Sequence, residues 1–212
     1  MPHAWWPIDP ADLAAFLIAA LVMEITPGPN MTYLAVLSVR HGQIAGLRAV
    51  LGVTLGLSAY MPAAAFGLTE VLALSAPLYA LLRWSGIVFL LWIAWDTLRG
   101  GDLDFAPSAL DRPFWRGLIA NLLNPKAALL YVTLLPNFIA PDHAPVWVQA
   151  IILGSCHIAI SILVHGSIVI SAGRLHVFVS RAFAAGGDGW IRRCSAAIIA
   201  LTAVWLAWET ER

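Results

Sequence analysis

The stretch Glu24-Ile-Thr-Pro-Gly-Pro-Asn30 lies inside an apolar segment that extends from about Leu13 to Val39. A segment of this length predicts a membrane-spanning helix, because roughly 20 apolar residues cross the hydrocarbon core of a bilayer. Pro27 and Pro29 each remove a backbone donor, and Gly28 places a flexible link between them. The sequence therefore predicts a span that is broken near mid-membrane, with helix ends that must face protein or a water-filled cavity.

A second break of the same kind is predicted at Asn121-Leu-Leu-Asn-Pro-Lys126, where Pro125 follows Pro27 by 98 positions. The same offset aligns three further identical pairs: Phe16 with Phe114, Tyr33 with Tyr131, and Gly56 with Gly154. If each half holds three spans, the second half enters the membrane upside down relative to the first, a recurring plan of secondary transporters. We therefore expect a single domain built from two inverted three-helix repeats, over about residues 1–105 and 106–212.

The composition of the whole chain agrees with a membrane location. Of the 212 residues, 60% are hydrophobic and only 11% are charged, and the mean hydropathy is +0.81. Helices are the default in lipid, because every backbone polar group there must be paired inside the protein. We predict an all-α integral membrane protein with about six transmembrane helices: Leu13–Val39, Ala49–Gly67, Tyr79–Leu98, Phe114–Ile139, Val146–Ala172 and Cys194–Trp208. The formal net charge of zero offers no electrostatic basis for binding nucleic acid.

The basic residues predict the orientation of these spans. Nine of the twelve lie in or beside the first, third and fifth connections: Arg40, Arg48, Arg99, Arg112, Arg116, Arg174, Arg181, Arg192 and Arg193. The remaining connections and the two ends carry mainly acidic residues, namely Asp9, Asp12, Glu70, Asp142, Glu209 and Glu211. Because basic loops stay in the cytoplasm, both termini are expected on the extracytoplasmic side.

Lys126 and Glu24 are the charged residues that lie beside the two predicted breaks. A charge at the bilayer centre costs about 2.5–3.5 kcal/mol on insertion scales, so each is expected to face a cavity or a partner. Lys126 is suited to hold the carboxylate of a substrate, or to pair with Glu24 when the site is empty. Glu24 is otherwise suited to hold a substrate ammonium or to carry a proton. The freed N-terminal helix ends carry partial positive charge, which also favours a carboxylate.

The fifth span carries two titratable residues, His157 and His165, which are eight positions apart and therefore share a helix face. Imidazole changes charge near neutral pH, so His165 joins Glu24 as a candidate for proton coupling. For His157, hydrogen bonding to a neighbouring helix is the favoured interpretation. Asp96 is expected to pair with Arg99, because the two are neighbours on one helix face.

The two cysteines, Cys156 and Cys194, are isolated from each other and from any partner at metal-ligand spacing. Neither has an obvious activating neighbour, and we expect two structural thiols. The histidines have no further ligand at a suitable spacing. We therefore predict no catalytic residue and no metal site.

These motifs resemble those of the lysine exporter and homoserine/threonine resistance family, the LysE/RhtB-type translocators. The resemblance covers nearly the whole chain, and its strongest points are Thr26-Pro-Gly-Pro-Asn30, Arg40-His-Gly42, the pair Gly52 and Gly56, Asn121-Leu-Leu-Asn-Pro-Lys-Ala127, and Leu135-Pro-Asn-Phe138. It implies a six-helix carrier of the bacterial inner membrane, not an enzyme, that exports amino acids or their derivatives, of lysine, homoserine/threonine or leucine type. It also implies that the proton-motive force drives export, with no organic cofactor. The candidate substrate-site residues are Thr26 and the eight to which the family motif carries over: Pro27, Gly28, Pro29, Asn30, Asn121, Asn124, Pro125 and Lys126.

The chain departs from the family pattern at Glu24, Asp96 and Cys194-Ser-Ala196, and these departures leave the substrate open. One alternative is an exporter of another small metabolite or of a cation, although Lys126 would repel cations. Others are an intramembrane thiol-redox protein, which the cysteine spacing disfavours, and a structural subunit of a larger complex. Four glycines suit close helix packing within one chain or between two copies of a homodimer, namely Gly42, Gly46, Gly52 and Gly56.

Overall fold

The computed structural model describes residues 6–66, 75–99, 112–140, 142–182 and 188–209. These residues form helices and no strand: α1 (Pro10–Ile25), α2 (Pro29–Ala65), α4 (Ala76–Arg99), α5 (Arg112–Leu122), α6 (Pro125–Leu129), the π-helix η2 (Leu130–Leu134), the 3-10 helix η3 (Leu135–Phe138), α7 (Val146–Ala182) and α8 (Asp188–Glu209). Four of the described helices are long and apolar enough to cross a membrane, and a bent pair over 112–122 and 125–138 makes a fifth. The predicted all-α membrane class is confirmed.

The first break falls where the prolines predict it. α1 ends at Ile25, and the backbone N–H of Thr26 still donates to the carbonyl of Val22, at 3.1 Å. α2 begins at Pro29, and Gly28 before it is extended, with φ −160° and ψ 176°. A proline suits the first position of a helix, because the N–H that it lacks has no partner inside the helix there.

The second break has the same form. α5 ends at Leu122, α6 begins at Pro125, and the two segments are bent by 49°. Asn124 lies before the proline in an extended conformation and caps the new helix with its side chain, which accepts from the N–H of Lys126 at 3.1 Å. Both predicted breaks are therefore confirmed, each with a proline at the first position of the second segment.

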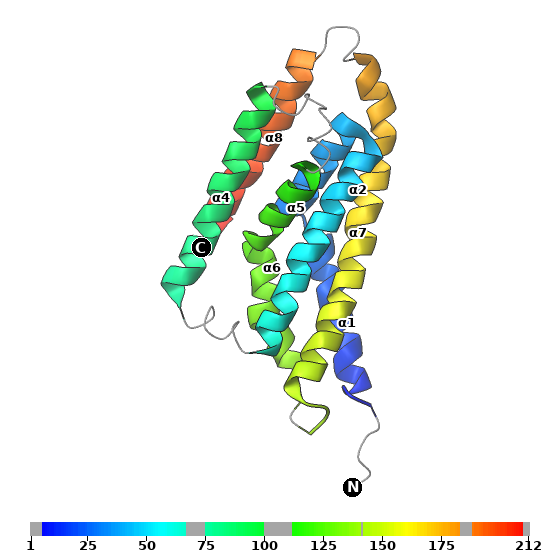
Figure 1. Cartoon of the computed structure of the whole chain (residues 1–212), viewed down its shortest axis with the longest axis vertical. Coiled ribbons are helices and arrows are strands. Elements are labelled where there is room, and N and C mark those ends of the chain that lie inside the picture. The colour runs from blue at the N-terminus through cyan, green and yellow to red at the C-terminus, as the bar shows by residue number, and fades with distance from the viewer. Residues whose placement is uncertain (1–5, 67–74, 100–111, 141, 183–187, 210–212) are drawn as a thin grey trace.

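α2 folds back on itself at Gly42. This residue has φ 81° and ψ 176°, a conformation that glycine adopts readily and other residues rarely do. A Cβ added to Gly46 would lie 2.2 Å from Oγ of Ser38, whereas eight residues of a straight helix advance about 12 Å. Figure 1 shows the two antiparallel arms, the first in blue and the second in cyan. α1 with the first arm replaces the predicted first span, and the second arm replaces the predicted second span. The described helices are thus compatible with six crossings in two inverted repeats.

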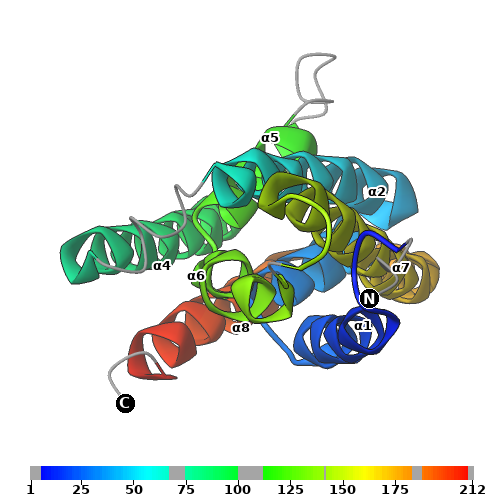
Figure 2. The same ribbon diagram turned by 90° about the horizontal axis from the view of Figure 1, so that it is seen from below.

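The helices form two groups. α2 packs extensively against α5 and α7, and α1 lies against α7. α4 packs mainly against α8, and this pair stands at one side of the others, as Figures 1 and 2 show. Both helix breaks lie among the closely packed helices α1, α2, α5 and α7.

The second arm of α2 crosses α5 at backbone contact. A Cβ added to Gly52 would lie 2.0 Å from the carbonyl oxygen of Phe114, and a Cβ added to Gly117 would lie 2.3 Å from that of Ala49. Small residues allow helix backbones to approach closely in membranes, where van der Waals packing drives helix association. Gly52 is therefore used for packing within the chain, and the homodimer stays a prediction.

Asp96 pairs with Arg116 of α5, so the predicted pairing with Arg99 was wrong. Arg99 instead lies over the ring of Trp95, with 4.4 Å between its guanidinium carbon and the ring centroid. Arg116 also lies over the ring of Trp92, at 5.2 Å. Helical spacing identified a partner on the same helix, but α5 brings a competing guanidinium that only the tertiary fold reveals.

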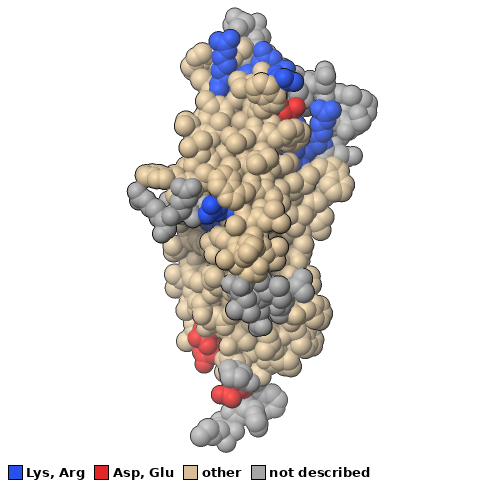
Figure 3. Space-filling view, turned by 90° about the vertical axis from the view of Figure 1, so that its left-hand side faces the viewer, with Lys and Arg blue, Asp and Glu red and all other residues tan. Residues whose placement is uncertain are grey.

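The charged residues are divided between the ends of the molecule. In Figure 3, Lys and Arg gather mainly at the end where α4 and α7 finish and α5 begins, and Asp and Glu are prominent at the opposite end. Glu70 and Glu211, which were assigned to the acidic side, lie outside the described residues. The charge division agrees with the alternation of basic and acidic connections in the sequence.

Candidate functional site

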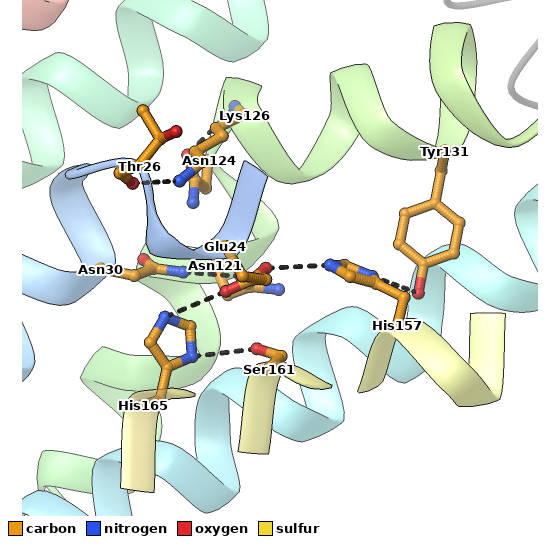
Figure 4. Close-up of polar contacts among 10 residues, drawn as sticks. All are labelled: Glu24, Thr26, Asn30, Asn121, Asn124, Lys126, Tyr131, His157, Ser161 and His165. Atoms are coloured by element: carbon orange, nitrogen blue, oxygen red, sulfur yellow. Dashed lines mark hydrogen bonds and ion pairs between the residues drawn. The ribbon is translucent and has the colours of Figure 1, made fainter. Parts of the chain in front are cut away.

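The two helix breaks lie side by side around a pocket (Figure 4). Its polar lining residues are Glu24, Asn30, Asn121, Asn124, Lys126, His157 and His165, and its apolar ones include Met23, Met31, Leu57, Ala127 and Leu130. The open space inside it is only about 20 Å³, room for about one water molecule, so the side chains themselves nearly fill the pocket. Both predicted halves of the chain contribute to the walls.

The ammonium group of Lys126 lies against the end of α1. Its Nζ donates to the carbonyl oxygen of Thr26 at 2.5 Å, and it forms no ion pair with Glu24. The side chain of Lys126 lies over Gly28, where a Cβ would be at van der Waals distance, 3.4 Å from its Cδ and 3.6 Å from its Nζ. The carbonyls at the C-terminus of a helix carry partial negative charge, which favours a cation at this position. Lys126 therefore connects the two breaks, because it follows the second break in sequence and donates to the helix end at the first one.

Two asparagines join the breaks on another side of the pocket. Nδ2 of Asn30 donates to Oδ1 of Asn121 at 2.7 Å, and both residues are buried. Among the described residues, Oδ1 of Asn30 and Nδ2 of Asn121 have no hydrogen-bond partner. Asn121 is held against Gly56, where a Cβ would lie 2.8 Å from its Nδ2. One acceptor and one donor are thus buried without a partner in the wall of the pocket, which is costly.

Glu24 lies between the two histidines of α7. Its Oε1 is 2.9 Å from Nε2 of His157, and its Oε2 is 3.5 Å from Nε2 of His165. Nδ1 of His157 lies 3.3 Å from the hydroxyl of Tyr131, and Nδ1 of His165 lies 2.9 Å from Oγ of Ser161. Figure 4 shows the carboxylate between the two imidazole rings. All three titratable groups are 9% exposed or less, so they form a buried proton-binding cluster.

Tyr131 links this cluster to the second break. Its ring stacks on Tyr60, with centroids 5.5 Å apart, and meets His157 edge-on at 5.4 Å. The hydroxyl of Tyr60 donates to the carbonyl oxygen of Leu122, at the end of α5, at 2.8 Å. A continuous series of contacts therefore joins Glu24 in the first half to the broken helix in the second.

Residues 21–210 match the family model described as LysE type translocator. This chain belongs to that family. The translocator is similar to the homoserine/homoserine lactone efflux protein of Salmonella typhimurium, at 26% identity over 184 residues, which cover 84% of this chain and 85% of the relative. It is also similar to the cysteine/O-acetylserine efflux protein of Klebsiella pneumoniae, at 32% identity over 148 residues, which cover 69% of this chain and 75% of the relative.

A leucine efflux protein of Klebsiella pneumoniae is 29% identical over 130 residues, which cover 58% of this chain and 61% of the relative. No solved structure matches this translocator. Family membership makes the chain a transporter and not an enzyme, as the sequence motifs implied. It also removes the basis for the thiol-redox alternative, and Cys156 and Cys194 are both free.

Most of the predicted site residues of this translocator meet at one place. Glu24, Gly28, Asn30, Asn121, Asn124, Lys126 and His165 all line the pocket. Thr26 is not among the lining residues: its carbonyl accepts from Lys126, and its hydroxyl donates back to the carbonyl of Val22 at 2.8 Å. Pro27, Pro29 and Pro125 are not among the lining residues and act by creating the breaks.

His157 is the residue that the sequence undervalued. It does bond to a neighbouring helix, as expected, but its closer partner is Glu24, and it lines the pocket. The signal for this role was its spacing from His165, which places both rings on one face of α7. Tyr131 and Ser161 had no such signal, since Tyr131 appeared only as a match of the internal repeat.

Proposed function

We propose that this translocator exports a neutral α-amino acid, or a close derivative, across the bacterial inner membrane in exchange for protons. The names of three relatives, which are efflux proteins for homoserine, cysteine and leucine, support a neutral amino-acid cargo. The observation that carries the proposal is the pocket at the two helix breaks, which combines groups for an ammonium with groups for a carboxylate.

The ammonium of such a substrate has two acceptors within the pocket, the carboxylate of Glu24 and the unpartnered Oδ1 of Asn30. A third acceptor, the carbonyl of Thr26, lies beside the pocket, where Lys126 contacts it. The carboxylate has the ammonium of Lys126, the unpartnered Nδ2 of Asn121 and the N-terminus of α2, where free N–H groups attract anions. A zwitterion satisfies both sets at once, whereas a simple cation or a simple anion leaves one set unmatched.

The charges of the pocket favour a neutral side chain on the substrate. Glu24 is the single carboxylate among its described lining residues, and it already faces His157 and His165. A cationic side chain would add positive charge beside Lys126 without a second counter-charge. Apolar walls, including Leu57 and Leu130, suit an aliphatic or small polar side chain instead.

Competition at Glu24 is the basis that we propose for proton coupling. Binding of a proton neutralises the carboxylate and weakens its hold on the substrate ammonium, so the proton and the substrate exclude each other. His157 and His165 contact the two oxygens of Glu24 from different positions along α7 and can deliver or remove that proton. Alternating access around such a site converts a proton gradient into export.

The proposed orientation has both termini outside the cytoplasm. It is supported by the basic end of the molecule, which contains the finish of α4 and α7 and the start of α5. Positively charged connections of membrane proteins stay in the cytoplasm. The repeat halves, about 1–105 and 106–212, are proposed to rock against each other about the pocket.

Transport into inside-out membrane vesicles tests the proposed function. Vesicles that contain the protein are expected to accumulate labelled leucine, homoserine or cysteine when their interior is acidified, and a proton ionophore is expected to abolish accumulation. Vesicles without the protein serve as the control. If vesicles with correctly inserted protein accumulate none of the three amino acids, the proposed amino-acid substrate is wrong. If the ionophore does not reduce accumulation, the proposed proton coupling is wrong.

Substitution of Asn121 tests the contribution of the amide pair to binding. Asn121→Ala removes the unpartnered Nδ2 of Asn121 and also its Oδ1, which accepts from Asn30. The substitution is expected to weaken substrate binding about tenfold, the equivalent of about one to two hydrogen bonds. The dissociation constant of the purified protein, followed by tryptophan fluorescence, checks this. Asn137→Ala is the matched control, because Asn137 is exposed and donates only to the carbonyl of Thr133. Equal affinities of the Asn121 variant and the unmodified protein would show that the amide does not contact substrate.

A further inference from the structure

Lys126 already places a primary ammonium in the pocket. The group donates to the carbonyl of Thr26 at 2.5 Å, at the C-terminus of α1, and Lys126 lines the same pocket as Glu24 and Asn30. Lys126 is the only lysine of the chain. Its stem lies over Gly28, where a Cβ would be 3.4 Å from Cδ of Lys126. The pocket therefore contains a cation of the same chemistry as the α-ammonium of an amino acid.

We propose that Lys126 is a tethered stand-in for the substrate: its ammonium occupies the position that the substrate ammonium takes, and substrate entry displaces it onto the substrate carboxylate. The proposal rests on the proposed function and assigns the two ends of the amino acid to particular atoms. The carbonyl of Thr26 receives the ammonium, Glu24 is the nearest carboxylate of the pocket, and the displaced Lys126 pairs with the substrate carboxylate. A single movement of Lys126 thus frees the carbonyl of Thr26 for the substrate ammonium and brings a cation to the substrate carboxylate.

The exchange explains why the pocket would require both ends of an amino acid. A simple amine displaces Lys126 but leaves its charge without a counter-ion in a low-dielectric setting, which is costly. A simple carboxylate pairs with Lys126 but leaves the carbonyl of Thr26 at the helix end without a donor. A zwitterion replaces the lost contact to Thr26 with an equivalent one and gives the displaced Lys126 a counter-ion, so the net charge of the site stays the same.

The methionine variant gives opposite expectations for two kinds of ligand. Lys126→Met keeps the length and apolar stem of the side chain and removes only the ammonium. Leucine and cysteine are expected to bind about tenfold or more weakly, since a charge-assisted contact to the carboxylate is lost. Their decarboxylated counterparts, isopentylamine and cysteamine, are expected to bind about tenfold more tightly, because no internal ammonium competes for Thr26 and Glu24.

Binding of these four ligands to the purified protein and to the variant is the deciding experiment. The proposal is overturned if the amines bind the variant no better than the unmodified protein, because Lys126 would then only hold the carboxylate. It is also overturned if both ligand classes weaken equally, as a purely structural role predicts. Arg83→Met, which removes a cation from α4 outside the pocket, is expected to leave all four affinities unchanged. If neither amino acid binds the unmodified protein, the proposed function fails instead.

A second measurement uses the unmodified protein and does not depend on the folding of a variant. Because the chain has one lysine, isotope-labelled lysine gives the NMR signals of Lys126 alone. Leucine and isopentylamine are each expected to shift these signals, and to different positions, since only leucine offers a new partner. Bound isopentylamine that leaves the Lys126 signals in place would contradict the displacement.

Discussion

Glu24→Gln is expected to abolish proton-driven accumulation, while exchange of substrate between the two sides of the membrane persists at higher substrate concentration, because Thr26 and Asn30 still accept the substrate ammonium. A glutamine keeps the size and hydrogen-bonding capacity of Glu24 beside His157, but it cannot bind or release a proton. One unit of pH gradient is equivalent to about 1.4 kcal/mol, so a carrier coupled to one proton supports about a tenfold accumulation. The accumulation ratio of the variant is expected to fall to about one.

Inside-out vesicles with an acidified interior measure the accumulation ratio, and vesicles preloaded with unlabelled substrate measure the exchange. Asp142→Asn serves as the matched control, because Asp142 is an exposed carboxylate that does not line the pocket. If the Glu24→Gln variant still shows proton-driven accumulation, Glu24 is not the coupling residue, and His157 and His165 become the candidates. Loss of both accumulation and exchange would show that the glutamine disturbs substrate binding itself.

Gly52→Ala is expected to destabilise the protein strongly, although it adds only one methyl group. The added Cβ would lie 2.0 Å from the carbonyl oxygen of Phe114, which belongs to backbone and cannot rotate away. Alanine gains about 1 kcal/mol of helix propensity over glycine. Overpacking costs about 1–3 kcal/mol and more where the backbone must shift, so the clash is expected to dominate and to separate the second arm of α2 from α5.

The fraction of protein that remains monodisperse in detergent after heating measures this effect. Gly166→Ala on α7 is the matched control, since no atom lies within 4 Å of a Cβ at that position. The control is expected to be as stable as the unmodified protein or slightly more stable. Similar heat resistance of the two variants would show that the α2–α5 crossing can open at little cost.

The sequence predicted those parts of the fold that depend on local chemistry. Pro27, Pro29 and Pro125 gave the positions of both breaks, because proline alters the backbone hydrogen bonds whatever surrounds it. The turn between the first two spans was placed correctly near Gly42, but it was expected to take several residues between Val39 and Ala49. Both arms in fact stay helical up to the glycine, which reverses the chain by itself.

The candidate site was predicted as a set of residues and not as a set of contacts. Mid-span charges are costly wherever they occur, so Glu24 and Lys126 were evident from hydropathy alone. Their partners were not, since Lys126 contacts a backbone carbonyl, which has no sequence signature. The same limit applies to Asp96, whose nearest arginine along its own helix was displaced as a partner by Arg116 of α5.

The pairing of α4 with α8 has a consequence for the order of assembly. α4 belongs to the first predicted half of the chain, but it packs mainly against α8, which comes after every other described helix along the chain. During translation α4 therefore enters the bilayer long before its main partner exists, with lipid in place of that partner. Final docking of α4 must wait until α8 has been synthesised, so a chain that stops before α8 would also leave α4 without its main partner.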